Sequence, residues 1–143
     1  MNWFHWPLLS AFFAGLTAIL AKIGVTGVDS NLATAIRTSV ILIFAWVIAL
    51  ATTKPLVMLD FHSRTWIFLS LSAIATGLSW LCYFRALQLG DASKVAPVDK
   101  LSVIFAILLA AIFLKEKITL QHLFGGFLIV SGALVLACKH TKA

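Results

Sequence analysis

Charged side chains are scarce in this sequence, and their scarcity excludes most classes of soluble protein. Only 11% of the 143 residues are charged, and five residues are Asp or Glu. A soluble domain carries roughly 25% charged residues. Hydrophobic residues make up 62% of the chain and the mean hydropathy is +1.05. We therefore expect an integral membrane protein with a single domain over residues 1–143.

Motifs for catalysis and cofactor binding are missing as well. The sequence has no phosphate-binding loop, no HExxH sequence and no Ser-His-Asp arrangement. Cys82 and Cys138 lie in apolar segments without a CxxC spacing, which is typical of small buried hydrophobic residues. His5, His62 and His122 fall on one predicted side of the membrane, where a histidine is more often an ordinary interfacial residue than a metal ligand. We expect no enzyme, no cofactor and no bound metal.

The positive net charge of +6 does not indicate nucleic-acid binding, because Lys and Arg are spread singly along the chain without a basic run. Lipid headgroups beside the membrane are the better partners for these cations. One predicted side carries Lys54, Arg64, Lys115 and Lys117, and the other carries Lys22, Arg85, Lys94, Lys139 and Lys142. A four-to-five balance favours neither orientation, so the sequence predicts insertion in both directions.

Five apolar runs are long enough to cross a bilayer as helices. They cover residues 6–23, 31–52, 66–87, 92–114 and 118–138, which predicts an all-α integral membrane protein of five transmembrane helices. Asp91 is expected to cap the fourth helix by accepting hydrogen bonds from its first amides. Asp29 or Ser30 is expected to cap the second helix.

Three charged residues, Arg37, Asp99 and Lys100, are expected to lie within the membrane, away from the ends of these runs. Arg37 and Asp99 each lie roughly 10 Å past a helix start, and a charge near the bilayer centre costs about 2.5–3.5 kcal/mol on insertion scales. Because opposite charges at one depth can pair, we predict a contact between Arg37 and Asp99, with Lys100 as a rival partner for Asp99. Such residues can bind a charged substrate, form a structural ion pair, or snorkel separately to the interface.

Polar side chains also follow one face of the third helix, at the spacing i, i+4, i+7 and i+11. These are Ser72, Thr76, Ser79 and Tyr83, and Trp80 lies beside them. The stripe is typical of a substrate path with aromatic walls, or of hydroxyls that bond back to their own helix. The fifth helix has a face of small residues, formed by Gly125, Gly126 and Gly132. Such a face predicts either a dimer interface or close packing within one chain.

Three short motifs resemble the EamA domain of the drug/metabolite transporter superfamily. They are Asp-Ala-Ser-x-Val-Ala-Pro-Val-x-x-Leu from Asp91, Leu-x-Glu-Lys from Leu114, and Gly-x-x-Leu-Ile-x-x-Gly from Gly125. Lys115 stands where the family usually has Gly. Most members carry two such domains in tandem, and this chain resembles the small five-helix bacterial and archaeal members that carry one.

The resemblance implies an exporter of a small organic metabolite or drug in the bacterial inner membrane, working by alternating access. Because EamA transporters are built from two inverted halves, one half alone is expected to form an antiparallel homodimer. Unlike the related small multidrug exporters, the first helix has no acidic residue, which leaves Asp99 as the candidate for proton coupling. A membrane scaffold or accessory subunit, or a subunit of a lipid-carrier flippase, remains the alternative.

Overall fold

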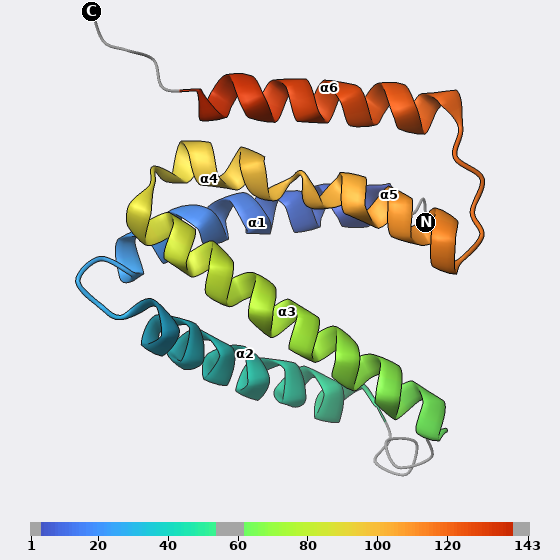
Figure 1. Cartoon of the computed structure of the whole chain (residues 1–143). Helices are drawn as coiled ribbons and strands as arrows, with labels where there is room; N and C mark the ends of the chain where they lie inside the picture. Colours follow the sequence, from blue (N-terminus) through green and yellow to red (C-terminus); the bar gives the residue numbers. More distant parts are fainter. Residues whose placement is uncertain (1–3, 54–61, 139–143) are drawn as a thin grey trace, which may run out of the picture. The chain divides into compact units, whose positions relative to one another are not determined.

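The computed structural model describes residues 4–53 and 62–138, and six α-helices account for most of them (Figure 1). They are α1 (His5–Gly24), α2 (Ser30–Thr52), α3 (Ser63–Leu89), α4 (Ala92–Asp99), α5 (Ser102–Phe113) and α6 (Leu120–Ala137). The described residues contain no strand, and five segments are long and apolar enough to cross a membrane. The predicted all-α class with five membrane spans is confirmed. Lys54, Lys139 and Lys142, which entered the charge count, lie outside the described residues.

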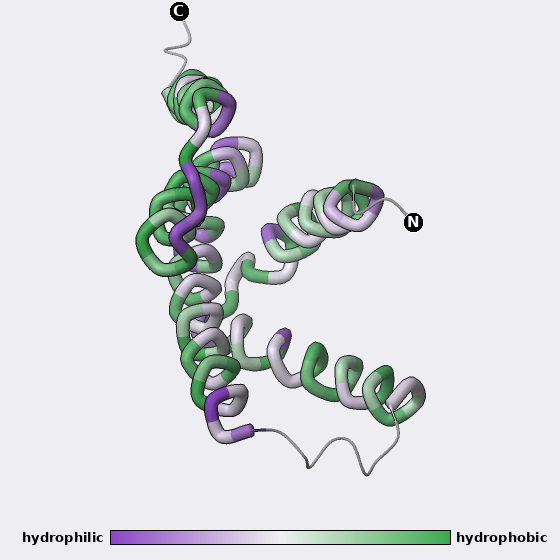
Figure 2. The backbone as a smooth tube through the Cα atoms, turned by 90° about the vertical axis from the view of Figure 1, so that its right-hand side faces the viewer, coloured by the Kyte–Doolittle hydropathy of each residue, from purple (hydrophilic) through white to green (hydrophobic). Residues whose placement is uncertain are grey.

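Nearly all large hydrophobic side chains on these helices are exposed in the isolated chain. At most 11% of any spanning segment is buried, and Figure 2 shows hydrophobic residues along most of the length of the helices. Monomeric soluble proteins rarely expose contiguous apolar patches larger than a few hundred Å². The lipid bilayer is the environment that covers this surface.

The chain divides into two compact units. Unit 1 comprises residues 1–20 and 89–143, and unit 2 comprises residues 21–88. Most of α1 therefore belongs to unit 1, whereas its last turn belongs to unit 2 together with α2 and nearly all of α3.

Unit 2 is held together where α1 ends, α2 begins and α3 ends. Val25, Phe84 and Leu87 are at most 3% exposed and form its apolar centre. The Lys22 ammonium donates to the carbonyl oxygen of Leu87 at 2.6 Å, which satisfies one of the carbonyls that a helix leaves without a partner at its C-terminal end. The Gln88 amide donates to the Val28 carbonyl oxygen at 2.6 Å. These bonds join the end of α3 to the last turn of α1 and to the turn that precedes α2.

The two predicted helix caps have different outcomes. Asp29 caps α2 as expected, because its carboxylate accepts from the backbone N–H of Asn31 at 2.9 Å and of Leu32 at 3.1 Å. The expectation for Asp91 is wrong. Asp91 precedes α4 without a side-chain capping bond, and its carboxylate contacts the Lys94 ammonium at 3.2 Å instead. The nearby cation replaces the backbone amides as the partner of this carboxylate.

In unit 1, α6 lies alongside α4 (Figure 1). The close approach depends on small residues, because Gly126 and Ala133 are both buried. A methyl group on Gly126 would lie 3.0 Å from Ile104 Cδ1 of α5. These two positions are seven residues apart and therefore share one face of α6.

The single helix predicted over residues 92–114 is interrupted, and this is the main correction to the predicted fold. Lys100 N–H donates to the Pro97 carbonyl at 3.1 Å and Leu101 N–H to the Val98 carbonyl at 3.0 Å. These are i to i−3 bonds, the tighter 3₁₀ pattern. Pro97 lies inside α4; the bond that its missing N–H removes would reach Ser93 in the first turn of α4, so the interruption begins three residues beyond the proline. The span therefore consists of α4 and α5, joined at Lys100 and Leu101.

Candidate functional site

The membrane cation of unit 2, Arg37, lies against aromatic rings of α3. Its guanidinium carbon is 4.4 Å from the centre of the Trp80 ring and 5.4 Å from that of Phe84. Both distances are within the range of a cation–π interaction. Such contacts contribute about 0.5–2 kcal/mol, which is less than the roughly 2.5–3.5 kcal/mol cost of placing the charge in the membrane. The rings therefore compensate only part of the cost.

The predicted polar stripe of α3 divides into two parts. Tyr83 belongs to the aromatic cluster, because its ring lies edge-on to Phe84 with the centroids 6.5 Å apart. Thr76 donates to the Ser72 carbonyl of its own helix at 2.9 Å. For this hydroxyl the alternative of a hydrogen bond back to its own helix is therefore confirmed. Ser72, Thr76 and Ser79 are exposed in the isolated chain. A role for these three in lining a substrate path stays a prediction.

Phe84 is the aromatic contact that sequence reasoning missed. Trp80 and Phe84 are four residues apart, which is the spacing that places two side chains on one helix face. That spacing could have identified the pair. The pair matters because Arg37 contacts both rings from α2. The helical periodicity of α3 alone does not predict that contact.

In unit 1, the interruption of the fourth span carries an ion pair. The Lys100 ammonium lies 3.4 Å from the Asp99 carboxylate, and both side chains are at least 36% exposed. The rival pairing named for Asp99 is therefore present. The predicted contact between Arg37 and Asp99 would join the two units and stays a prediction.

The three glycines of α6 are not equivalent. Gly126 is buried within unit 1 by Ile104, so it packs inside the chain. A Cβ on Gly125 or Gly132 would meet no atom within 4 Å, which leaves both positions open to another helix. The predicted dimer interface is thus reduced to Gly125 and Gly132, and it remains a prediction.

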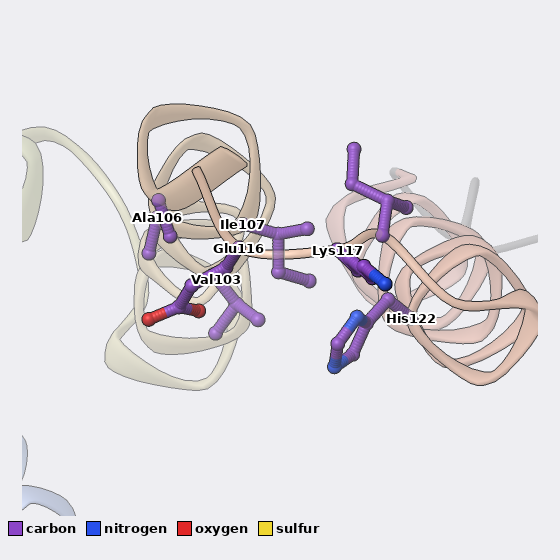
Figure 3. A pocket seen from close by; sticks show the side chains of 8 residues that line it. Val103, Ala106, Ile107, Glu116, Lys117 and His122 are labelled. Atoms are coloured by element: carbon purple, nitrogen blue, oxygen red, sulfur yellow. The ribbon is translucent and has the colours of Figure 1, made fainter. Parts of the chain in front are cut away.

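A groove of about 290 Å³ lies between α5 and α6 (Figure 3). Its wall is mostly apolar, and Glu116, Lys117 and His122 lie at the end near the connection between the two helices. The His122 ring accepts from the Thr119 N–H at 3.3 Å and the Thr119 hydroxyl accepts from the His122 N–H at 3.4 Å. This reciprocal arrangement caps α6. Among the described residues, no three His, Cys, Asp or Glu side chains lie together as metal ligands.

These features define a multi-pass α-helical membrane protein with charged groups inside its spans. The family model that matches the sequence is the EamA-like transporter family, over residues 1–138. The chain belongs to this family, and the function that follows is membrane transport.

Known relatives agree with the assignment. An uncharacterized transporter of a Sinorhizobium species, named for the cobO 3′ region, is 50% identical over 95% of this chain and 96% of its own length. An uncharacterized protein of Methanocaldococcus jannaschii is 31% identical over 93% of this chain and 94% of its own length. The uncharacterized transporter YvbV of Bacillus subtilis is 38% identical over 51% of this chain and 23% of its own length. No solved structure matches the chain.

Proposed function

We propose that this protein exports a small organic metabolite or drug across the bacterial inner membrane. It acts as a single EamA-like domain over residues 1–143 and as an antiparallel homodimer by alternating access. The observation that carries the proposal is the interruption of the fourth span at an ion pair. In transporters, discontinuous helices place backbone groups and charges at a substrate site near the bilayer midplane.

The depth of the interruption supports this interpretation. Asp99 lies seven residues after Ala92, about 10 Å along the helix, and Lys100 lies 13 residues before Phe113, about 20 Å from that end. A stretch of 3₁₀ pattern in the middle of a helix often marks a functional hinge. A scaffold subunit does not require a helix interruption with an ion pair, such as that of Asp99 and Lys100, at this depth in the membrane. The proposed substrate-binding residues of unit 1 are Asp99 and Lys100, and those of unit 2 are Arg37, Trp80 and the polar face of α3.

Binding and flux of the purified full-length protein test the proposal. A metabolite library is screened by thermal shift, since a ligand that binds only the folded state raises its apparent stability. Each hit is then tested for flux in proteoliposomes. We expect Lys100→Gln and Asp99→Asn to abolish flux while the helical content is retained.

The matched control is a second ion pair among the described residues of unit 1, between Asp91 and Lys94 at the start of α4. Lys94→Gln should leave flux within about twofold of the parent protein, because exposed interfacial pairs contribute little. Normal flux in the Asp99 and Lys100 variants would refute the proposed site. A protein that binds no solute and supports no flux, while remaining folded, would favour the scaffold alternative.

A further inference from the structure

The contacts of Arg37 fix its guanidinium deep in the span. Trp80 lies nine residues before the end of α3 at Leu89, about 13 Å along the helix. The guanidinium carbon is closer to the Trp80 ring than to the Phe84 ring, at 4.4 Å against 5.4 Å. A side chain that snorkels toward the interface points to the helix end. Arg37 instead lies beside the more deeply placed ring.

The aromatic rings satisfy the charge of Arg37 only in part. A ring attracts the guanidinium through the ring face, but the N–H donors of the guanidinium point outward in its own plane and require acceptors. Within the described residues of unit 2, the one acidic side chain is Asp29, and it caps α2. The hydroxyls of Thr34 and Thr38 donate to carbonyls of their own helix at 2.7 and 2.8 Å, and Tyr83 interacts with Arg37 electrostatically. These hydroxyl groups are neutral, so a carboxylate is the stronger acceptor for the guanidinium.

Arg37 and Trp80 also remain accessible, since both are only partly buried, whereas Phe84 is 3% exposed. The buried Phe84 ring holds the guanidinium from one side, and the partly exposed Trp80 presents apolar surface next to it. A ligand at this place meets a planar cation and an aromatic ring together. A planar fork of N–H donors is the geometry that binds a carboxylate through two parallel hydrogen bonds.

We infer that Arg37, held against Trp80 and Phe84, binds the anionic group of the transported solute, and that this group is a carboxylate carried on an aromatic or other apolar body. The inference rests on the proposed transport function and names the substrate class for it. The carboxylate accepts from the guanidinium while the apolar body packs on Trp80. A cationic solute is repelled by Arg37, and a neutral amide forms weaker hydrogen bonds, so the site discriminates by charge.

Trp80 provides the optical signal for the test. The full-length protein, with Trp3, Trp6, Trp46 and Trp66 replaced by Phe, is placed in nanodiscs of neutral phosphatidylcholine at pH 7.5. Benzoate is titrated while Trp80 emission is recorded, with benzamide and benzylamine as neutral and cationic probes of the same shape. We expect a saturable change with benzoate alone. Thermal shift of the parent protein by benzoate gives a second readout that does not depend on the tryptophan replacements.

Substitutions identify the group responsible. Arg37→Lys retains the charge but loses the planar fork, and it should weaken benzoate binding about tenfold, the factor that corresponds to one lost charged hydrogen bond. Arg37→Gln should abolish binding. The matched control is Arg64, whose guanidinium carbon lies 5.7 Å from the Phe68 ring near the start of α3. Arg64→Gln should leave benzoate binding unchanged.

Several results would overturn the inference. Equal responses to benzoate and benzamide, or unchanged benzoate binding in Arg37→Gln, would show that Arg37 does not select an anion. If phosphatidylglycerol in the nanodisc changes Trp80 emission and benzoate does not, the anion is a lipid headgroup and the assignment to a solute is wrong.

Flux separates this inference from the proposed function. Saturable benzoate binding without flux of any bound acid in proteoliposomes would leave the anion site standing and refute transport. Flux of neutral or cationic solutes, together with no benzoate response, would leave transport standing and refute the anion site.

Discussion

Replacement of the glycines of α6 separates packing within the chain from packing between chains. At Gly126 an added Cβ would lie 3.0 Å from Ile104 Cδ1, whereas Gly132 has no atom within 4 Å of that position. Carbon atoms in favourable contact are about 3.5–4.0 Å apart. Gly126→Ala therefore requires the end of the Ile104 side chain to move, at a cost of about 0.5–1.5 kcal/mol. The gain from removing a helical glycine is about 0.5–1 kcal/mol, so the alanine variant should be nearly neutral.

Leucine is the more informative substitution. Gly126→Leu adds carbon atoms that Ile104 cannot accommodate by moving its terminal methyl group. We expect a loss of about 1–3 kcal/mol in the free energy of unfolding, the range measured for overpacked contacts. Gly132→Leu should raise the free energy of unfolding of the monomer by about 0.5–1 kcal/mol, the gain from removing a helical glycine, because its surroundings in the chain are open.

Reversible unfolding in detergent, at a dilution where the protein is monomeric, measures both variants. Sedimentation at higher concentration then measures the dimer fraction, which should fall in Gly132→Leu if α6 forms the dimer interface. Equal losses of monomer stability in the two leucine variants would refute the distinction between the two glycines. An undiminished dimer in Gly132→Leu would place the interface on another helix.

Three further predictions concern the hydrogen bond between α1 and α3, the orientation of the chain in the membrane, and the pairing of Arg37 with Asp99. Lys22→Met should lower the free energy of unfolding by about 1.5–3 kcal/mol, because it removes a charged hydrogen bond to Leu87; chemical denaturation measures this loss, and an unchanged midpoint would contradict it. A reporter fused after Ala143 should be active on both sides of the membrane, and two lysines added to the turn before α2 should bias it to one side; signal from one side alone in the unmodified chain would rule out dual topology. Arg37→Ala and Asp99→Ala should each destabilise the protein, with a double variant less impaired than the sum of the two, whereas additive effects in the double-mutant cycle would show that the side chains do not interact.

The positions of the membrane spans followed from the sequence to within three residues at every boundary, and the interruption inside the fourth span was not predicted. Hydropathy and helix length are local properties, so they need no information about neighbouring helices. The cap at Asp29 was also predicted, because its partners are the next few amides of the same chain. The sequence does not predict the tighter turns at Lys100 and Leu101, because both residues keep a backbone N–H and the apolar run continues beyond them.

The candidate site was predictable in its residue types and not in its contacts. Residue numbers are sufficient to place Arg37, Asp99 and Lys100 inside apolar spans, because depth along a helix follows from position in the chain. The contacts of Arg37 with Trp80 and Phe84, the burial of Gly126 and the open surroundings of Gly132 become apparent only when the helices are packed together. Each of these contacts depends on how one helix is rotated and spaced against another. That arrangement is set by packing at positions such as Leu87 in unit 2 and Ile104 in unit 1, which the periodicity of a single helix does not specify.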